Sequence, residues 1–330
     1  MKLGDNVETL LQFIEYSKTN PSYELEVLFK NISNNKITGE QFNNVMKRLK
    51  GMFKTVTTTE NLDIFYQYAQ DKQSNIRVSL SGLEAVRKYC KTNDLKNISN
   101  VSYLKKSQIS IGGNKLRPLN INNYNIRVNM KEEEPINDSR EIGNLMLDWK
   151  KKLKTFRYKK RYSFKTKDNL FQFDLTVIKA SNVRYSYLDS KSFKKKNLPE
   201  HMKKFIILPS HISDLNSYWD SLTAESTVKV RGKRIENYVF TKTLQESQTL
   251  TNPVEYEIEL EYIGNKINYG GGNQDILNKL VGNVGFVLQA LQKSYYIISE
   301  DEKNMVRTEY KDLMGTIKFK APMNVTLELK

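Results

Sequence analysis

Apolar and polar side chains alternate along several stretches of the chain, which is the pattern of β-strands with one buried face. The alternation is most regular at 156–165 and 170–179, and the turn residues Lys167, Asp168 and Asn169 between them predict a hairpin. Strands are also predicted around 24–29, 61–68, 75–80, 125–130, 227–230, 239–244 and 254–263. Strands therefore outnumber helices in the expected fold.

Helical spacing of apolar residues predicts a smaller set of helices. They cover 1–18, 38–50, 81–91, 140–154, 273–296 and 300–314. The first carries acidic residues and lacks the profile of a signal peptide, and no run of about 20 apolar residues predicts a membrane span. The single cysteine, Cys90, lies in a predicted helix, and we expect a buried structural thiol in a reducing compartment.

Two of the predicted strands place carboxylates on every second residue. Glu24 and Glu26 form the first row, and Glu255, Glu257, Glu259 and Glu261 form the second. Side chains two apart on a strand share a face, about 6.5–7 Å from one another. Like charges this close repel unless a cation or a basic lining offsets them. The rows therefore predict a metal site.

Other strands carry basic or mixed polar faces opposite an apolar face. On 156–165 this face holds Arg157, Lys159, Arg161, Ser163 and Lys165, and on 170–177 it holds Gln172, Asp174 and Thr176. Arg77 and the set Arg127, Asn129 and Lys131 follow the same rule. Any one of them is typical of a half-exposed antiparallel strand. Together they predict a sheet closed on itself, a tunnel with charges inside and apolar residues outside, covered by helices.

The charge balance indicates what kind of partner the protein binds. Among 330 residues, 53 are Lys or Arg and 37 are Asp or Glu, a net charge of +16 that suits a polyanionic partner. A bias toward Lys in an Asn-, Ile- and Tyr-rich chain would give the same number. His201 and His211 have no zinc spacing, and no phosphate-binding loop of NTPases or nucleophile triad is visible. Glutamates suit Mg²⁺ or Mn²⁺, and Arg and Lys suit a phosphate chain.

The same residues resemble the motifs of a known family, the triphosphate tunnel metalloenzymes. The strands YELEV from Tyr23 and YEIELE from Tyr256 look like its two metal-binding motifs. Between them, YKKRYSF from Tyr158 and FDLT from Phe173 look like its basic strand and its D-L-T strand. The likeness is greatest to the RNA triphosphatase domain that opens the mRNA capping enzymes of large DNA viruses, of the giant-virus and poxvirus types. It spans about 23–313, and 181–253 matches least.

The resemblance implies an α+β fold built on an eight-stranded antiparallel β-barrel. It also implies metal-dependent removal of the γ-phosphate from 5′-triphosphate RNA, the first step of mRNA capping, with nucleoside triphosphates as further possible substrates. Carried over by position, the metal ligands are Glu24, Glu26, Glu257, Glu259 and Glu261, of which Glu257 and Glu261 are ligands or water-positioning acids, for Mg²⁺ or Mn²⁺. Phosphate would bind Arg77, Arg127, Lys131, Lys159, Arg161 and Thr176, and Asp174 completes the catalytic set with Lys159, Arg161 and the glutamates. Glu255 is left out.

The resemblance further implies a domain organisation and a location. Residues 1–316 would form the tunnel domain, with 181–253 as a variable insertion, and 317–330 would lead toward a guanylyltransferase domain. No K-x-D-G motif of that domain occurs in the chain, so we expect phosphate removal without GMP transfer. Guanylyltransferase and methyltransferase domains are expected in the full-length protein. The resemblance places the protein in the host cytoplasm or the virion, neither secreted nor in a membrane.

In the small-molecule branch of the superfamily a basic residue lies two positions after the first E-x-E motif, whereas this chain has Leu28 there and its base at Lys30. This difference disfavours a thiamine-triphosphatase or cyclase-like function. Other interpretations stay open. A non-catalytic RNA- or polyphosphate-binding β-domain would share the basic strands, although it would have little use for aligned glutamates. The Lys-rich stretch 191–204 is either a path for RNA or a solvated charged loop.

Overall fold

Eight antiparallel strands close into a barrel in this computed structural model, which describes residues 4, 6–29, 36–53, 55–69, 72–187, 191–198, 203, 206–208, 214–230, 234–264 and 269–316. The strands follow one another around the barrel in the order β1 (Tyr23–Phe29), β16 (Glu255–Tyr262), β11 (Phe171–Ala180), β10 (Lys154–Lys165), β2 (Thr57–Ala69), β4 (Ile76–Ser81), β5 (Val101–Ser107) and β9 (Ile126–Pro135). Pairing of β9 with β1 closes the ring. The predicted closed sheet is thereby confirmed.

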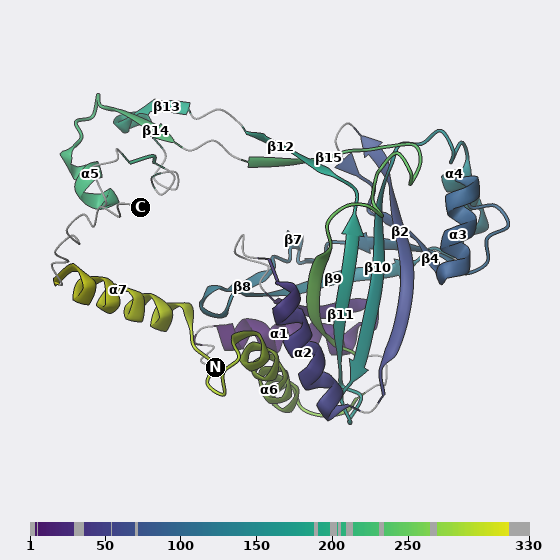
Figure 1. Ribbon diagram of the computed structural model, residues 1–330, viewed down its shortest axis with the longest axis horizontal. Helices are drawn as coiled ribbons and strands as arrows, with labels where there is room; N and C mark the ends of the chain where they lie inside the picture. Colours follow the sequence, from purple (N-terminus) through teal and green to yellow (C-terminus); the bar gives the residue numbers. More distant parts are fainter. Residues whose placement is uncertain are drawn as a thin grey trace, which may run out of the picture.

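The long hairpin β10–β11 forms one wall of the barrel (Figure 1). Its turn is tight because Asn169 adopts a left-handed conformation (φ 55°) and donates from its backbone N–H to the carbonyl of Thr166 at 2.9 Å. The register pairs Arg161 with Thr176 and Ser163 with Asp174. Alternate residues therefore face the interior as polar rows, while the residues between them, such as Phe164 and Phe173, face outward.

Three helices cover the outward apolar face on one side of the barrel. They are α1 (Asn6–Thr19), α2 (Gly39–Met52) and α6 (Asn273–Gln292), which lie together in Figure 1. Thr38 and Gln41 form a capping box at the start of α2, and the ring of Phe42 packs 4.8 Å from that of Tyr256. The core beneath them combines residues from all three helices and from β1, β9, β11 and β16. This packing holds the two acidic strands side by side.

A second core lies under the short helices α3 (Leu83–Thr92) and α4 (Ser139–Met146). The indole N–H of Trp149 donates to the hydroxyl of Tyr89 at 3.2 Å in its centre. The expectation that Cys90 is buried is wrong, because the thiol is exposed. The buried face of α3 is formed by Ala85, Val86 and Tyr89, and a residue one position further along a helix is rotated about 100° away from that face.

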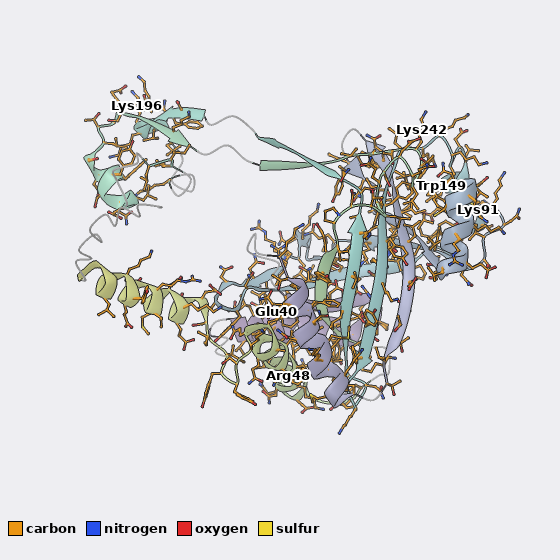
Figure 2. All side chains as sticks on the ribbon, viewed as in Figure 1. Glu40, Arg48, Lys91, Trp149, Lys196 and Lys242 are labelled. Atoms are coloured by element: carbon orange, nitrogen blue, oxygen red, sulfur yellow. The ribbon has the colours of Figure 1, made fainter. Side chains whose placement is uncertain are left out.

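The described residues of 181–253, the predicted variable insertion, include a ribbon and a small module. The ribbon pairs β12 (Val183–Tyr187) with β15 (Arg234–Tyr238) and projects from the barrel (Figure 1). The module pairs β13 (Lys191–Lys194) with β14 (Thr227–Val230), includes α5 (Leu215–Ser221), and has a core of its own around Leu198, Ile206 and Val228. Lys196 marks it in Figure 2, far from Trp149 on the barrel side.

Several predicted boundaries differ from the structure. The helix predicted at 140–154 ends at Met146, since β10 already begins at Lys154, and the strand predicted at 239–244 is a single bridge from Thr241 to Lys154 followed by turns. The strand β5 was not predicted. The last helices are α6, which ends four residues earlier than expected, and α7 (Glu300–Thr316).

Short elements complete the described chain. They are β3 (Lys72–Gln73), β6 (Ser110–Ile111), β7 (Asn114–Lys115), β8 (Leu119–Ile121) and the 3₁₀ turns η1 (Asn122–Tyr124) and η2 (Lys195–Asn197). His201, His211 and the segment 317–330 lie outside the described residues. No helix within the described ranges is both long and apolar enough to cross a membrane.

Candidate active site

The interior of the barrel is a polar cavity of about 400 Å³. Eight carboxylates and six basic side chains line it, a formal excess of two negative charges. The acids are Glu24, Glu26, Asp63, Glu133, Asp174, Glu257, Glu259 and Glu261, and the bases are Arg77, Lys106, Lys131, Arg157, Lys159 and Arg161. The tunnel therefore concentrates charge of both signs on its interior wall.

The two acidic strands are direct neighbours in the barrel. The register of β1 and β16 places Glu26 opposite Glu261. Glu26 is buried and accepts hydrogen bonds from the Asn129 amide at 3.0 Å and the Lys131 ammonium at 3.2 Å, both from β9 on the other side of β1. The rows predicted from sequence thus meet on one wall.

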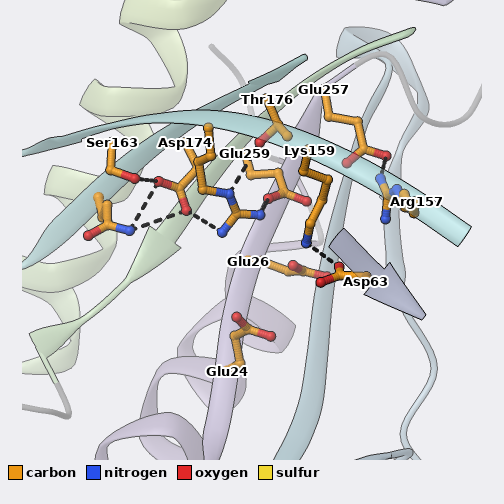
Figure 3. Close-up of polar contacts among 12 residues, drawn as sticks. Glu24, Glu26, Asp63, Arg157, Lys159, Ser163, Asp174, Thr176, Glu257 and Glu259 are labelled. Carbon is orange, nitrogen blue, oxygen red and sulfur yellow. Dashed lines mark hydrogen bonds and ion pairs between the residues drawn. The ribbon is translucent and has the colours of Figure 1, made fainter. Parts of the chain in front are cut away.

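Arg161 connects the basic strand to the acids. Its guanidinium donates to Asp174 at 2.9 Å, to Glu259 at 3.1 Å and to the hydroxyl of Thr176 at 3.2 Å. Asp174 is buried and also accepts from Ser163 at 2.5 Å (Figure 3). These contacts fix the guanidinium plane, which is the geometry that binds phosphate oxygens in pairs.

Lys159 and Arg157 pair with acids on other strands. Lys159 forms an ion pair with Asp63 of β2, a buried carboxylate that also accepts from the Ser79 hydroxyl at 2.7 Å. Figure 3 shows Lys159 pointing toward Asp63, and Arg157 beside its partner Glu257. The two cations lie on the same inward row of β10 as Arg161, since they are two and four residues before it.

A third group occupies the wall built by β4, β5 and β9. Lys106 forms ion pairs with Glu133 and, at 3.4 Å, with Glu24. Arg77 lies 3.8 Å from Glu133. Lys106 therefore bridges the acidic strand β1 and the carboxylate of β9.

Burial raises the pKa of two of the predicted metal ligands. The pKa of Glu24 rises to about 8 because desolvation and the neighbouring carboxylates outweigh the opposing effect of Lys106. The pKa of Glu259 rises to about 7 through desolvation and the nearby charge of Glu257, against the effect of Arg161. Burial therefore favours the protonated form of Glu24 at neutral pH and brings the pKa of Glu259 close to neutrality.

The ion pairs shift other groups toward their charged forms, with one exception. Burial opposes ionisation of Asp63, but the charges of Lys159 and Arg77 lower its pKa. Burial likewise opposes the charge of Arg161, while Glu259 and Asp174 raise its pKa. For Lys159, desolvation and three neighbouring guanidinium groups outweigh Asp63 and lower its pKa. A bound anion would relieve the positive charge crowded around Lys159.

Ten of the predicted site residues line this cavity. They are Glu24, Glu26, Arg77, Lys131, Lys159, Arg161, Asp174, Glu257, Glu259 and Glu261. Thr176 is buried behind Arg161 and touches the site through that side chain. Arg127 does not reach the cavity lining, and it donates to Asn120 of β8 at 2.9 Å. Glu255 also lies outside the lining and pairs with Lys36.

Sequence reasoning missed four charged residues of the lining. Arg157 lies on the inward row of β10, and the alternation alone would have included it. Asp63 is the one charged residue on its face of a predicted strand, a signal that parity could have found. Lys106 lies on β5, a strand that was not predicted. Glu133 lies on β9, in the part that extends beyond the predicted end at residue 130.

The donor set fits a divalent cation in its chemistry, although ligands are not assembled around a common point. Five glutamate carboxylates from two adjacent strands are the oxygen donors that Mg²⁺ and Mn²⁺ prefer. Among the described residues, no three Asp, Glu, His or Cys side chains converge closely enough to hold a metal. Four of these glutamates instead form ion pairs with basic side chains: Glu26 with Lys131, Glu24 with Lys106, Glu259 with Arg161 and Glu257 with Arg157. A cation would have to draw these carboxylates away from their basic partners.

A closed antiparallel barrel with this charged interior is the triphosphate tunnel fold, as the sequence resemblance implied. The RNA triphosphatase domain of the trifunctional mimivirus mRNA capping enzyme has a TM-score of 0.50 to this chain at 14% identity, covering 87% of this chain and 99% of that domain. At that identity the comparison shows a shared fold. The S. pombe RNA triphosphatase Pct1 gives a TM-score of 0.36 at 12% identity and covers 93% of both chains. No family model matches the sequence, and no curated protein sequence does.

Proposed function

We propose that the chain is a metal-dependent polynucleotide 5′-triphosphatase that removes the γ-phosphate from 5′-triphosphate RNA. One observation carries the proposal: a tunnel with six basic side chains nonetheless has an excess of two carboxylates. A triphosphate is itself strongly anionic, so a cation that offsets the charge of the ionised glutamates would favour its binding there. The basic strands alone would serve a phosphate-binding module, whereas the acidic wall suits a cation and its phosphate ligand together.

Each group of residues then has a chemical role. Arg161, fixed by Asp174 and Thr176, and Lys159, fixed by Asp63, would bind phosphate oxygens and stabilise the charge that develops on the leaving diphosphate. Glu24, Glu26 and Glu259 would hold Mg²⁺ or Mn²⁺, with Glu257 and Glu261 supporting them. A bound divalent ion polarises phosphoryl oxygens and offsets their charge. Arg77, Lys106 and Lys131 line the remaining wall, where they would neutralise the rest of the phosphate chain.

We extend the proposal to the organisation of the chain. Residues 1–316 would form the triphosphatase domain, with the ribbon and module of 181–253 inserted in it. By analogy with the capping-enzyme resemblance, the substrate would be nascent viral mRNA in the cytoplasm or virion, with nucleoside triphosphates as alternative substrates.

The proposal is tested by measuring phosphate release from γ-labelled triphosphate RNA with Mg²⁺ or Mn²⁺. We expect turnover that requires the metal and falls by at least about 100-fold in Glu26→Gln and Glu259→Gln. Glu255→Gln is the matched control, because Glu255 is on the same strand and parity as Glu259 but lies outside the cavity. Thermal melts of each variant separate loss of chemistry from loss of fold. Metal-independent RNA binding without turnover would instead identify a binding module.

A further inference from the structure

The inward row of β10 ends in a lysine that the tunnel chemistry does not use. Along this row Arg157 pairs with Glu257, Lys159 with Asp63 and Arg161 with Asp174. Lys165, the last member, is exposed at the hairpin and forms no ion pair with any described residue. The same is true of Lys167 two residues later. The three cations of this row inside the tunnel are therefore paired with acids, and the two lysines at this end are not.

These two lysines line a separate pocket of about 520 Å³ at the hairpin, which we call the hairpin mouth. Its wall also includes Thr55, Thr57 and the exposed residue Met52. Ser163 belongs to this wall too, and its hydroxyl donates to Asp174, which lines the tunnel. The pocket and the tunnel thus share the Ser163–Asp174 contact.

The opposite end of the tunnel has a different charge pattern. There the glutamate row of β16 opens to solvent, with side-chain exposure of 47% for Glu255, 37% for Glu257 and 16% for Glu259. Lys36 and Arg157 pair with the outer two of these glutamates. A polyanion approaching the barrel therefore meets unpaired lysines at the hairpin mouth and a row of partly exposed glutamates at the other end.

We infer that RNA enters the tunnel through the hairpin mouth, and that the mouth binds the nucleotides that follow the triphosphate. Lys165 and Lys167 bind phosphodiester groups, the hydroxyls of Thr55 and Thr57 face the ribose, and Met52 offers an apolar contact to a base. The inference rests on the proposed triphosphatase function, and it adds a subsite that distinguishes RNA from a bare phosphate chain. Contacts of this kind hold a strand in position without reading its sequence.

The test compares three substrates that differ in what lies beyond the triphosphate. Inorganic tripolyphosphate has no nucleoside, ATP has one, and a short triphosphate RNA adds phosphodiesters. In the double variant Lys165→Ala, Lys167→Ala we expect KM for RNA to rise roughly five- to tenfold, the loss typical of two exposed charge contacts, with kcat unchanged. KM for tripolyphosphate stays at its wild-type value. The slope of log KM for RNA against log salt becomes shallower by about 1.4, since each single-strand phosphate contact contributes about 0.7.

Lys36→Ala at the opposite end is the matched control, because it also removes one exposed lysine close to the barrel. If Lys36→Ala raised KM for RNA but not for tripolyphosphate, RNA would enter at the opposite end of the tunnel, and the inference would be overturned. An equal rise of KM for tripolyphosphate and RNA in the double variant, or no rise for either, would overturn it as well. Wild-type turnover of tripolyphosphate and RNA tests the triphosphatase function separately, so the two failures are distinguishable.

Discussion

Glu24 and Glu259 keep their protons in the folded, metal-free protein over a pH range in which free carboxylates have lost them. Their pKa values rise from 4.5 to about 8 and about 7. The folded state therefore binds more protons than the unfolded state between these limits, and its stability falls as pH rises through that window. A metal ion needs the deprotonated carboxylates, so its stabilising effect should grow with pH.

We expect the melting temperature in chelator to fall between pH 5 and pH 8, and the fall to be smaller in the double variant Glu24→Gln, Glu259→Gln. Melting curves recorded at constant ionic strength measure the difference. Added Mn²⁺ should raise the wild-type melting temperature more at pH 8 than at pH 6. If the melting temperatures of the two proteins changed with pH by the same amount, these carboxylates would not carry the raised pKa values.

At the scale of single residues, the alternation of side chains along each strand predicted which of them point inward, and ten of the predicted site residues line the cavity. Parity could not predict partners, because each pairing depends on which strands are neighbours. Arg157 has Glu257 within reach only because β11 and β16 follow β10 around the barrel. Arg127 has the correct parity and is paired with Leu28, which lines the cavity, but its own side chain donates to Asn120 of β8 and is not part of the lining.

The strand β11 combines two functions on its two faces. Asp174 points into the tunnel and fixes Arg161, while Phe173 is buried outside, with its ring 5.8 Å from Phe53 and 6.3 Å from Phe286. A substitution at one position should therefore act on stability, and a substitution at the next on activity.

We expect Phe173→Ala to lower the free energy of unfolding by about 3–5 kcal/mol, the usual cost of a phenylalanine-sized cavity in a core. Asp174→Asn keeps the shape of the side chain and should lower turnover with a much smaller change in stability. Urea denaturation and phosphate release measured on both proteins check the pair. Similar losses of stability in both variants would contradict this division between the faces.

Strands with an apolar face were predicted well, and β5 shows why others were not. In this strand, Val101 and Tyr103 alternate as apolar residues that pack against the second core, but Leu104, Lys105 and Lys106 then break the alternation. Its extended conformation comes from hydrogen bonds to β4 and β9, which are distant in sequence. The strand predicted at 239–244 is wrong for the opposite reason. Its sequence contains β-forming residues, but in the structure only Thr241 pairs with another strand, through a single bridge to Lys154.

At the scale of the whole molecule, the inserted module has a core separate from both cores of the barrel. The ribbon that carries it ends in the pair Tyr187 and Arg234. A protein in which Asn-Gly replaces residues 188–233 would close this ribbon as a two-residue hairpin. We expect it to fold, to melt within a few degrees of the full chain, and to hydrolyse tripolyphosphate at the wild-type rate.

The reason is that, among the described residues of the replaced segment, none lines the cavity and none belongs to a barrel strand. Circular dichroism melts and phosphate release check the result. An insoluble product, or a melting temperature far below that of the full chain, would show that the module supports the barrel. A lower rate on RNA alone would assign the module a part in holding the substrate.

The closure of the barrel through β1 also governs when the tunnel can form during synthesis. β1 pairs with β9 on one side and with β16 on the other, and Leu25 is opposite Tyr262. Contacts so distant in sequence are slow to form because a long loop must close first. The last seam can therefore form only after residue 262 has left the ribosome, and until then β1 and β11 each present an unpaired edge of the kind on which chains aggregate.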